Sequence, residues 1–128
     1  MKKEAVLTKD APAPIGPYSQ AIRSGNLLFC SGQIPLDPVS GQLVGAGDVK
    51  AQTKRVMENI SAVLKAGGAT FDQIVKTTIF LKSMGDFPMV NEIYGTYFTG
   101  VAPARSTVEV ARLPKDVSVE IEVLAVLG

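Results

Sequence analysis

The sequence predicts an α+β fold: a six-stranded mixed sheet with two helices packed on one face. Six segments have the alternating polarity or the β-branched residues that are typical of strands. Two longer segments repeat apolar residues at spacings of three and four, as amphipathic helices do. Each helix follows a strand, and such crossovers place the helices against one sheet. A length of 128 residues suits a single domain, 1–128.

The N-terminal part of the chain combines short strands with a proline-rich loop. Over the whole chain, the expected strands cover residues 4–8, 20–23, 27–34, 73–82, 103–111 and 117–125. Prolines within residues 10–21 forbid a helix there and impose extended backbone. This segment has the composition of a linker, but Ile15 and Tyr18 would be unusual in a free tether. We therefore interpret it as an ordered loop that places Tyr18.

Both helices have recognisable ends. Asp48 is a suitable N-cap for the first helix, which ends at Gly67-Gly68. The second helix covers Phe87 to Phe98, with Asp86 as its cap and Pro88 in its first turn. The residues expected in the core are Val49, Thr53, Val56, Ile60, Val63 and Leu64 of the first helix and Phe87, Val90, Tyr94, Tyr97 and Phe98 of the second. The basic side of the first helix is interpreted as a solvated face, with an RNA site as the alternative.

The last two strands carry a cluster of charges on their polar face. Arg105, Thr107 and Glu109 alternate on one strand, and Glu120 and Glu122 on the next. If these strands pair, a guanidinium that can grip a carboxylate lies beside acids that can handle a proton. This combination indicates chemistry on a small anionic substrate. The face is too polar for an ordinary core, so we expect it to meet another subunit.

Composition excludes several classes of chemistry. There is no histidine, which rules out Ser-His-Asp and Cys-His catalysis and His-ligated zinc. The single cysteine, Cys30, forms no internal disulfide, and its apolar neighbours favour a small buried hydrophobe over a reactive thiol. The net charge of +1 gives no general attraction to nucleic acid or membranes. With no apolar run of membrane-spanning length and no secretory leader, we expect a cytoplasmic protein, with an organelle as the alternative.

Four ordered motifs resemble those of one family. They are Ile-Gly-Pro-Tyr-Ser-Gln-Ala at 15–21, Ser-Gly-Gln-Ile-Pro at 31–35, Val-Asn-Glu-Ile-Tyr at 90–94, and a C-terminal set at 103–107, 113–116 and 119–122. Their order and separation extend over nearly the whole chain. On these motifs the chain resembles the Rid family (reactive intermediate deaminase, YjgF-type).

The resemblance implies a homotrimer whose protomers have a fold similar to bacterial chorismate mutase, with three clefts between neighbouring subunits. Family members of the deaminase type hydrolyse 2-aminoacrylate and related enamines or imines, such as 2-iminobutanoate and 2-iminopropanoate, to 2-oxo acids and ammonia. No cofactor or metal is implied. The expected partners are a small anionic imine, enamine or 2-oxo acid and further copies of the chain.

The resemblance also nominates residues for catalysis and for binding the substrate carboxylate. Arg105 matches the arginine that grips the carboxylate, and its planar fork suits that task better than lysine would. Thr107 stands where bacterial relatives often have cysteine, so it offers its backbone N–H but no thiol. Glu120 matches the acid that positions or activates the attacking water.

Four further residues match positions that line the family's cleft. Tyr18 is nominated among the catalytic residues, and Ser31 among the polar groups that bind substrate. Gly32 is expected to permit close backbone approach, and Asn91 to offer an amide on the cleft side.

The protonation of Glu120 is a further expectation from the sequence. A free glutamate titrates near ~4.3, and a neighbouring Arg105 would lower its pKa, favouring a base that acts on the water. The donor of a proton to carbon is unassigned. Glu122, Glu109 and Arg112 have two interpretations, as site residues or as members of ion pairs with a neighbouring chain.

Two other classes of function are weighed against a deaminase. An endoribonuclease or translation inhibitor, an activity attributed to some relatives, gains little from a near-neutral chain that lacks histidine. A non-catalytic protein that binds 2-oxo acids, or acts in regulation or as a chaperone, could use the same arginine without turnover.

Overall fold

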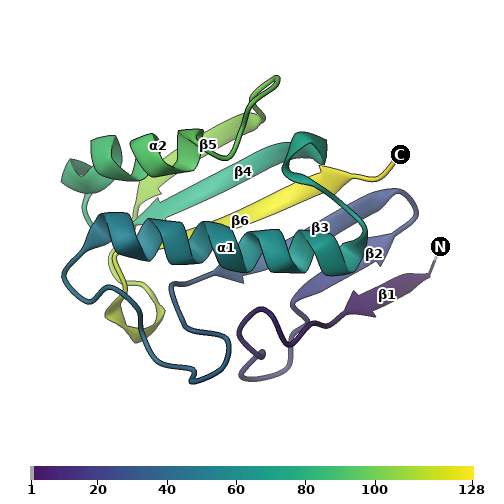
Figure 1. Cartoon of the computed structure of the whole chain (residues 1–128), viewed down its shortest axis with the longest axis horizontal. Helices are drawn as coiled ribbons and strands as arrows, with labels where there is room; N and C mark the ends of the chain where they lie inside the picture. Colours follow the sequence, from purple (N-terminus) through teal and green to yellow (C-terminus); the bar gives the residue numbers. More distant parts are fainter. Residues whose placement is uncertain (1) are drawn as a thin grey trace.

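Six strands form one mixed sheet, and both helices pack on the same face of it (Figure 1). The computed structural model describes residues 2–128. Its elements are β1 (Lys3–Val6), β2 (Ala21–Ser24), β3 (Leu27–Gln33), α1 (Val49–Gly67), β4 (Ile74–Leu81), α2 (Phe87–Gly95), β5 (Ala104–Glu109) and β6 (Val119–Val126). The predicted fold class and element order are confirmed. The second helix is shorter than expected, because residues after Gly95 continue in tighter turns such as Tyr97 N–H to Tyr94 O.

The spatial order of the strands is β1-β2-β3-β6-β4-β5. Neighbouring strands are antiparallel except β4 and β5, which run parallel because α2 crosses over between them. The C-terminal strand β6 is inserted between β3 and β4 and pairs with both. The condition that the last two strands pair is therefore not met: β4 separates β5 from β6.

This strand order also separates the charges that the sequence placed together. Arg105 is level with Thr77 in the β4–β5 ladder, and Thr77 is fully buried under the helices. Glu120 and Glu122 are level with Phe80 and Thr78, which alternate with the buried positions of β4 and so face away from the helices. The predicted common polar face does not exist, because Arg105 and the two glutamates lie on opposite faces of the sheet.

The core lies between α1 and the sheet, as the helical periodicity predicts. All six residues expected in the core from the first helix are buried: Val49, Thr53, Val56, Ile60, Val63 and Leu64. In α2, Val90 and Tyr94 are buried and Phe87 is half-buried; Tyr97 and Phe98, which lie beyond the end of α2, are also half-buried. Cys30 is a buried member of the core, and burial raises the pKa of its thiol to about 12. This confirms the interpretation of Cys30 as a small hydrophobe.

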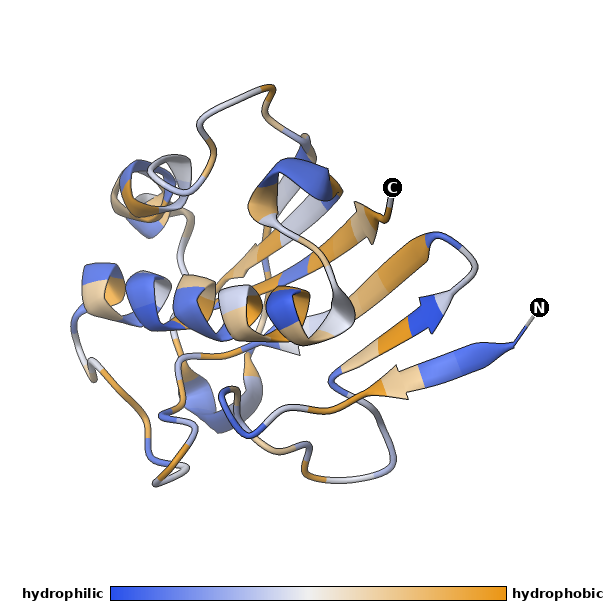
Figure 2. Cartoon of the chain, turned by 45° about the vertical axis from the view of Figure 1, so that its right-hand side comes forward, coloured by the Kyte–Doolittle hydropathy of each residue, from blue (hydrophilic) through white to orange (hydrophobic). Residues whose placement is uncertain are grey.

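The helix-free face of the sheet mixes apolar and polar residues. Phe29 on β3 is 46% exposed and Val108 on β5 is 41% exposed. Polar side chains lie beside them, and Lys76 Nζ donates a hydrogen bond to Ser106 Oγ at 2.9 Å across the β4–β5 ladder. Figure 2 shows hydrophobic colour along β6 and hydrophilic colour along most of β1. Among residues 2–128, no helix has both the length and the apolar character needed to cross a membrane.

Candidate functional site

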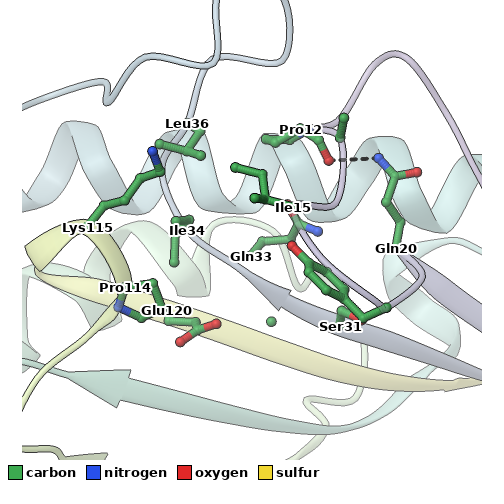
Figure 3. A pocket seen from close by; sticks show the side chains of 13 residues that line it. Pro12, Ile15, Gln20, Ser31, Gln33, Ile34, Leu36, Pro114, Lys115 and Glu120 are labelled. Atoms are coloured by element: carbon green, nitrogen blue, oxygen red, sulfur yellow. Dashed lines mark hydrogen bonds between the residues drawn. The ribbon is translucent and has the colours of Figure 1, made fainter.

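A cavity of about 570 Å³ lies where the end of β3 and the start of β6 meet the proline-rich loop (Figure 3). Four of the nominated residues line it: Tyr18, Ser31, Gly32 and Glu120. We call these four the cavity group. Apolar side chains make up much of the remaining wall, among them Ile15, Ile34 and Leu36. The structure thus gathers four nominated residues from three separate segments of the chain.

The loop that carries Tyr18 is ordered by a buried amide that the sequence reasoning missed. The Gln20 side chain is 1% exposed and accepts a hydrogen bond from Thr8 N–H at 2.7 Å. Its Nε2 lies within bonding distance of the carbonyls of Thr8, Ala11 and Pro12, at 3.1, 3.2 and 2.9 Å. A single amide therefore holds the loop, which confirms that the segment is not a free linker.

Ser31 fastens the same loop from the other side. Its hydroxyl donates to the carbonyl of Ser19 at 2.6 Å, and its backbone N–H donates to the carbonyl of Gln20 at 3.0 Å. The hydroxyl proton is thus engaged within the chain, and only the oxygen lone pairs are left for a ligand. Tyr18, two residues before Gln20, has a 53% exposed side chain on the cavity wall.

Glu120 lies directly over Gly32. A Cβ at residue 32 would stand 3.0 Å from the carboxyl carbon of Glu120 and even closer to one of its oxygens. The β3–β6 ladder is irregular at this point, between Cys30 and Gln33. The missing side chain at Gly32 therefore makes the space that the Glu120 carboxylate occupies.

The pKa of Glu120 moves in the opposite direction to the one expected. Burial raises it, and the neighbouring negative charge of Glu122 raises it further. The expected lowering depended on a nearby Arg105, which lies on the other face of the sheet. Within one chain, Glu120 consequently holds a proton more readily than a glutamate in water.

A second set of nominated residues lies at the edge of the sheet, beside α2. Arg105 Nη1 donates a hydrogen bond to Asn91 Oδ1 at 2.7 Å. The guanidinium carbon of Arg105 stands 5.2 Å from the centre of the Phe87 ring and 5.1 Å from that of Tyr94. Thr107 follows two residues later on the same face of β5. We call Asn91, Arg105 and Thr107 the edge group.

The guanidinium of Arg105 is held in place but not neutralised. The rings of Phe87 and Tyr94 attract it through cation–π contacts. The hydroxyl of Tyr94 shares a 2.8 Å hydrogen bond with the buried Thr77, which fixes that ring. No carboxylate among residues 2–128 forms an ion pair with Arg105, so its remaining donors are open to an anion.

Two of the three charged residues with two interpretations have partners within the chain. Glu109 accepts a hydrogen bond from Met84 N–H at 2.8 Å, and Arg112 pairs with Asp116 at 2.7 Å. Both contacts are structural. Glu122 forms no ion pair within residues 2–128, and its charge acts on Glu120.

The turn before β6 has an unusual backbone. Lys115 has φ 55° and ψ 21°, and Asp116 also has φ 55°. This left-handed region costs about 1–2 kcal/mol for each residue that has a Cβ. Asp116 is secured by two bonds from Arg112, at 2.7 and 3.1 Å. The sequence predicts a turn between the last two strands but not its left-handed backbone, since neither residue is glycine.

Two buried amides on α1 support the rest of the cavity wall. Asn59 Nδ2 donates to the carbonyls of Ile34 and Leu36, at 3.2 and 3.0 Å. Gln52 Oε1 accepts from the N–H of Ser118 at 2.9 Å, two residues before Glu120. Sequence reasoning missed both, although a polar residue on an apolar helix face is the signal that could have found them.

The comparisons with known proteins agree with the motifs. Residues 8–127 match the family described as endoribonuclease L-PSP. The chain is 49% identical over 126 residues to 2-iminobutanoate/2-iminopropanoate deaminase of Mus musculus, covering 98% of this chain and 93% of that protein. YyfA of Yersinia pestis, of the conserved Rid family, has a TM-score of 0.95 and 52% identity over 98% of this chain and 100% of that one. TdcF of E. coli, solved with bound serine, has a TM-score of 0.93 and 41% identity over 98% and 99%.

Replacing Gln20 tests whether its amide holds the loop. Gln20→Leu keeps the volume but leaves the Thr8 N–H and several carbonyls without partners, so we expect the free energy of unfolding to fall by about 2–4 kcal/mol. Urea denaturation at equal chain concentration measures this change. Hydrogen exchange at the Thr8 amide should accelerate at the same time, and exchange as slow as in the wild type would contradict the assignment. Gln42→Leu, at an exposed position, is the control and should change stability by less than about 0.5 kcal/mol.

Adding a methyl group at Gly32 tests the close approach of Glu120. In Gly32→Ala the carboxylate must move out of its space toward water, so the pKa of Glu120 should fall toward its ordinary value. Carbon-13 NMR titration of the glutamate carboxyls reports this pKa, with Glu120→Gln identifying the signal. In Gly100→Ala the new methyl meets only an ordinary contact at 3.7 Å, and the signal should stay unchanged. An unaltered Glu120 titration in Gly32→Ala would refute the arrangement.

Proposed function

Because the chain belongs to the Rid family, whose family description is endoribonuclease L-PSP, we propose that it is an enamine and imine deaminase. It would hydrolyse 2-aminoacrylate and the imines 2-iminopropanoate and 2-iminobutanoate to 2-oxo acids and ammonia. The relative from Mus musculus carries the name of this activity and aligns with nearly the whole chain. The observation that carries the proposal is the guanidinium of Arg105, which lies over the rings of Phe87 and Tyr94 and forms no ion pair with a carboxylate of residues 2–128.

We propose that each active site joins two chains of a homotrimer. The edge group and the cavity group lie on opposite faces of one sheet, so a small substrate cannot touch both within a protomer. β5 ends the strand order, most of its side chains are exposed, and the helix-free face offers Phe29 and Val108 to a neighbour. Docking of one chain's sheet edge near another chain's cavity would bring Arg105 to Glu120. The trimer and the shared cleft account together for the two separated groups.

Arg105 and Thr107 would bind and orient the substrate. The open donors of the guanidinium would take the carboxylate as a fork, with the backbone N–H of Thr107 as a further donor. The Asn91 amide keeps the guanidinium in place through the bond at 2.7 Å. These contacts would fix the orientation of a planar imine. Correct orientation removes a large part of the free-energy barrier to the addition of water, a reaction that already proceeds without an enzyme.

Glu120 would move the proton in both halves of the hydrolysis. Its carboxylate takes a proton from water as the oxygen adds to the carbon of the protonated imine, which gives a carbinolamine. The carboxylic acid returns that proton to nitrogen, and the C–N bond breaks as the C=O bond forms and the hydroxyl proton passes to solvent. The products are a 2-oxo acid, ammonia and this proton, and the carboxylate is regenerated. A raised pKa suits a group that alternates between base and acid. An enamine must first accept a proton at carbon, and the protonated form of Glu120 is our candidate donor.

A non-catalytic binding protein is the rival function, since the structure of TdcF holds serine rather than an imine. A dehydratase that releases the enamine in the presence of this protein separates the two functions. Faster loss of the enamine indicates a deaminase, and unchanged loss indicates a binding protein. Cleavage of RNA that tracks with the same site variants would instead indicate an endoribonuclease.

Removing the guanidinium tests the role of Arg105. Arg105→Ala loses a charge-assisted fork, so we expect kcat/KM for 2-iminopropanoate to fall by about two orders of magnitude. Arg105→Lys keeps the charge without the fork and should recover only part of the loss. Size-exclusion chromatography with light scattering should give both variants the same trimeric mass as the wild type. Near-normal turnover by Arg105→Ala would refute the assignment.

Mixing two inactive variants tests whether the cleft is shared between chains. Arg105→Ala and Glu120→Gln, unfolded and refolded together, should regain about a quarter of the wild-type activity, since about one cleft in four then receives both intact residues. Separately refolded samples are the control. No recovery in mixed trimers of confirmed composition would place both residues in the same chain's site.

The pH dependence of turnover tests the origin of the raised pKa of Glu120. A base must be ionised, so kcat/KM should fall as the pH drops through that pKa. Glu122→Gln removes the negative charge that raises the pKa of Glu120, so the acid limb should move to lower pH. Glu4→Gln removes a distant charge on β1 and should leave the limb in place. A limb that does not move in Glu122→Gln, or that moves to higher pH, would exclude the proposed coupling.

A further inference from the structure

Among residues 2–128, Lys115 is the one residue with a positive charge on the wall of the cavity. Glu120 is the one negative residue there, and the other lining residues are neutral. Lys115 forms no ion pair with Glu120 or with any other carboxylate of residues 2–128. The Lys115 ammonium has no role in the proposed reaction, because Arg105 would bind the substrate carboxylate next to the reacting carbon.

The backbone that carries Lys115 is strained and firmly held. Lys115 and Asp116 both have φ 55°, a region that favours glycine. The turn is closed by hydrogen bonds from Asp116 N–H to Leu113 O at 3.0 Å and from Val117 N–H to Pro114 O at 3.3 Å, besides the ion pair of Asp116 with Arg112. Strain of this kind is found at functional sites, where the surrounding structure maintains it.

The two charges occupy different parts of the cavity. In Figure 3 the Lys115 side chain extends beside Leu36, whereas the Glu120 carboxylate lies on the other side of Ile34. A ligand held next to Glu120 would therefore direct its side chain along an apolar wall toward the ammonium. A substrate with a second carboxylate at the end of its side chain would match this arrangement, since that group would lie near Lys115 and away from Glu120.

We propose that Lys115 receives the distal carboxylate of imines derived from dicarboxylic amino acids, and so sets a preference for these substrates. The inference rests on the proposed deaminase function. In the reaction, water adds to the C=N carbon of the dicarboxylic imine, the C–N bond breaks, and a 2-oxo dicarboxylate and ammonia leave. Arg105 of a neighbouring chain binds one carboxylate and Lys115 the other, so each anionic group of the substrate has a cation.

Binding of stable 2-oxo acids tests the preference without turnover. The probes are 2-oxoglutarate and 2-oxobutanoate, titrated by calorimetry into the intact assembly. The ratio of their dissociation constants should favour 2-oxoglutarate in the wild type, and this preference should shrink about threefold to tenfold in Lys115→Gln. Lys115→Arg should keep most of it. Lys54→Gln, at an exposed position on α1, is the control and should leave the ratio unchanged.

A second variant guards against misfolding. Lys115→Gly removes the same charge at a position whose φ suits glycine, so it should fold at least as well and lose the same preference. The preference should also weaken as salt is raised, as expected for an exposed ammonium. A ratio that is equal in the wild type, Lys115→Gln and Lys115→Gly overturns the inference.

Turnover separates this inference from the function on which it rests. An amino-acid oxidase supplies 2-iminopropanoate from alanine or 2-iminoglutarate from glutamate. If the protein turns over 2-iminopropanoate but the ratio of dissociation constants is the same with and without Lys115, only the role of Lys115 is overturned. A ratio that depends on Lys115, without turnover of either imine, supports the dicarboxylate subsite and overturns the deaminase.

Discussion

The position of β6 decides what the rest of the molecule can do. This last strand enters between β3 and β4 and pairs with both, so its side chains alternate between the core under α1 and the open face. Glu120 is thereby placed over Gly32 at the rim of the cavity. Because β6 does not pair with β5, β5 stays at the edge of the sheet, where Arg105 donates a hydrogen bond to Asn91 of α2. One strand order thus places the cavity group and the edge group on opposite faces of the sheet.

Buried amides give the irregular parts of the site their precision. The cavity wall consists largely of loops, which ordinarily have no fixed partners for their backbone groups. Here Gln20, Gln52 and Asn59 supply those partners, and within residues 2–128 every buried polar side-chain atom is hydrogen-bonded. Each amide binds a different segment of the wall. Removing one would leave paired groups unsatisfied at the site itself, so stability and function are coupled through these bonds.

The periodicity of apolar residues was sufficient to predict the helices and strands, but not which residues of different strands share a face of the sheet. Spacings of three and four identified the buried side of α1, because one helix packs on one sheet whatever the strand order. The neighbourhood of Arg105 and Glu120 depends on pairing between distant strands, which alternation within each strand does not encode. The family resemblance nominated both groups of residues, and the structure places one group on the wall of a cavity and the other at the edge of the sheet. The left-handed backbone at Lys115 arises from the closing of a short turn. The sequence does not predict it, because the position is not a glycine.

The separation of Arg105 from Glu120 on opposite faces of the sheet has an electrostatic consequence. While Arg105 is absent from the cavity, burial and Glu122 keep the pKa of Glu120 raised, and the carboxyl group is poised to hold a proton. An arginine brought by a neighbouring chain would lower that pKa, and a bound carboxylate would offset the arginine's charge. The protonation state of Glu120 would then depend first on assembly of the chains and then on whether a substrate occupies the cleft. A residue that must serve as base and then as acid benefits from surroundings whose charge changes when substrate binds.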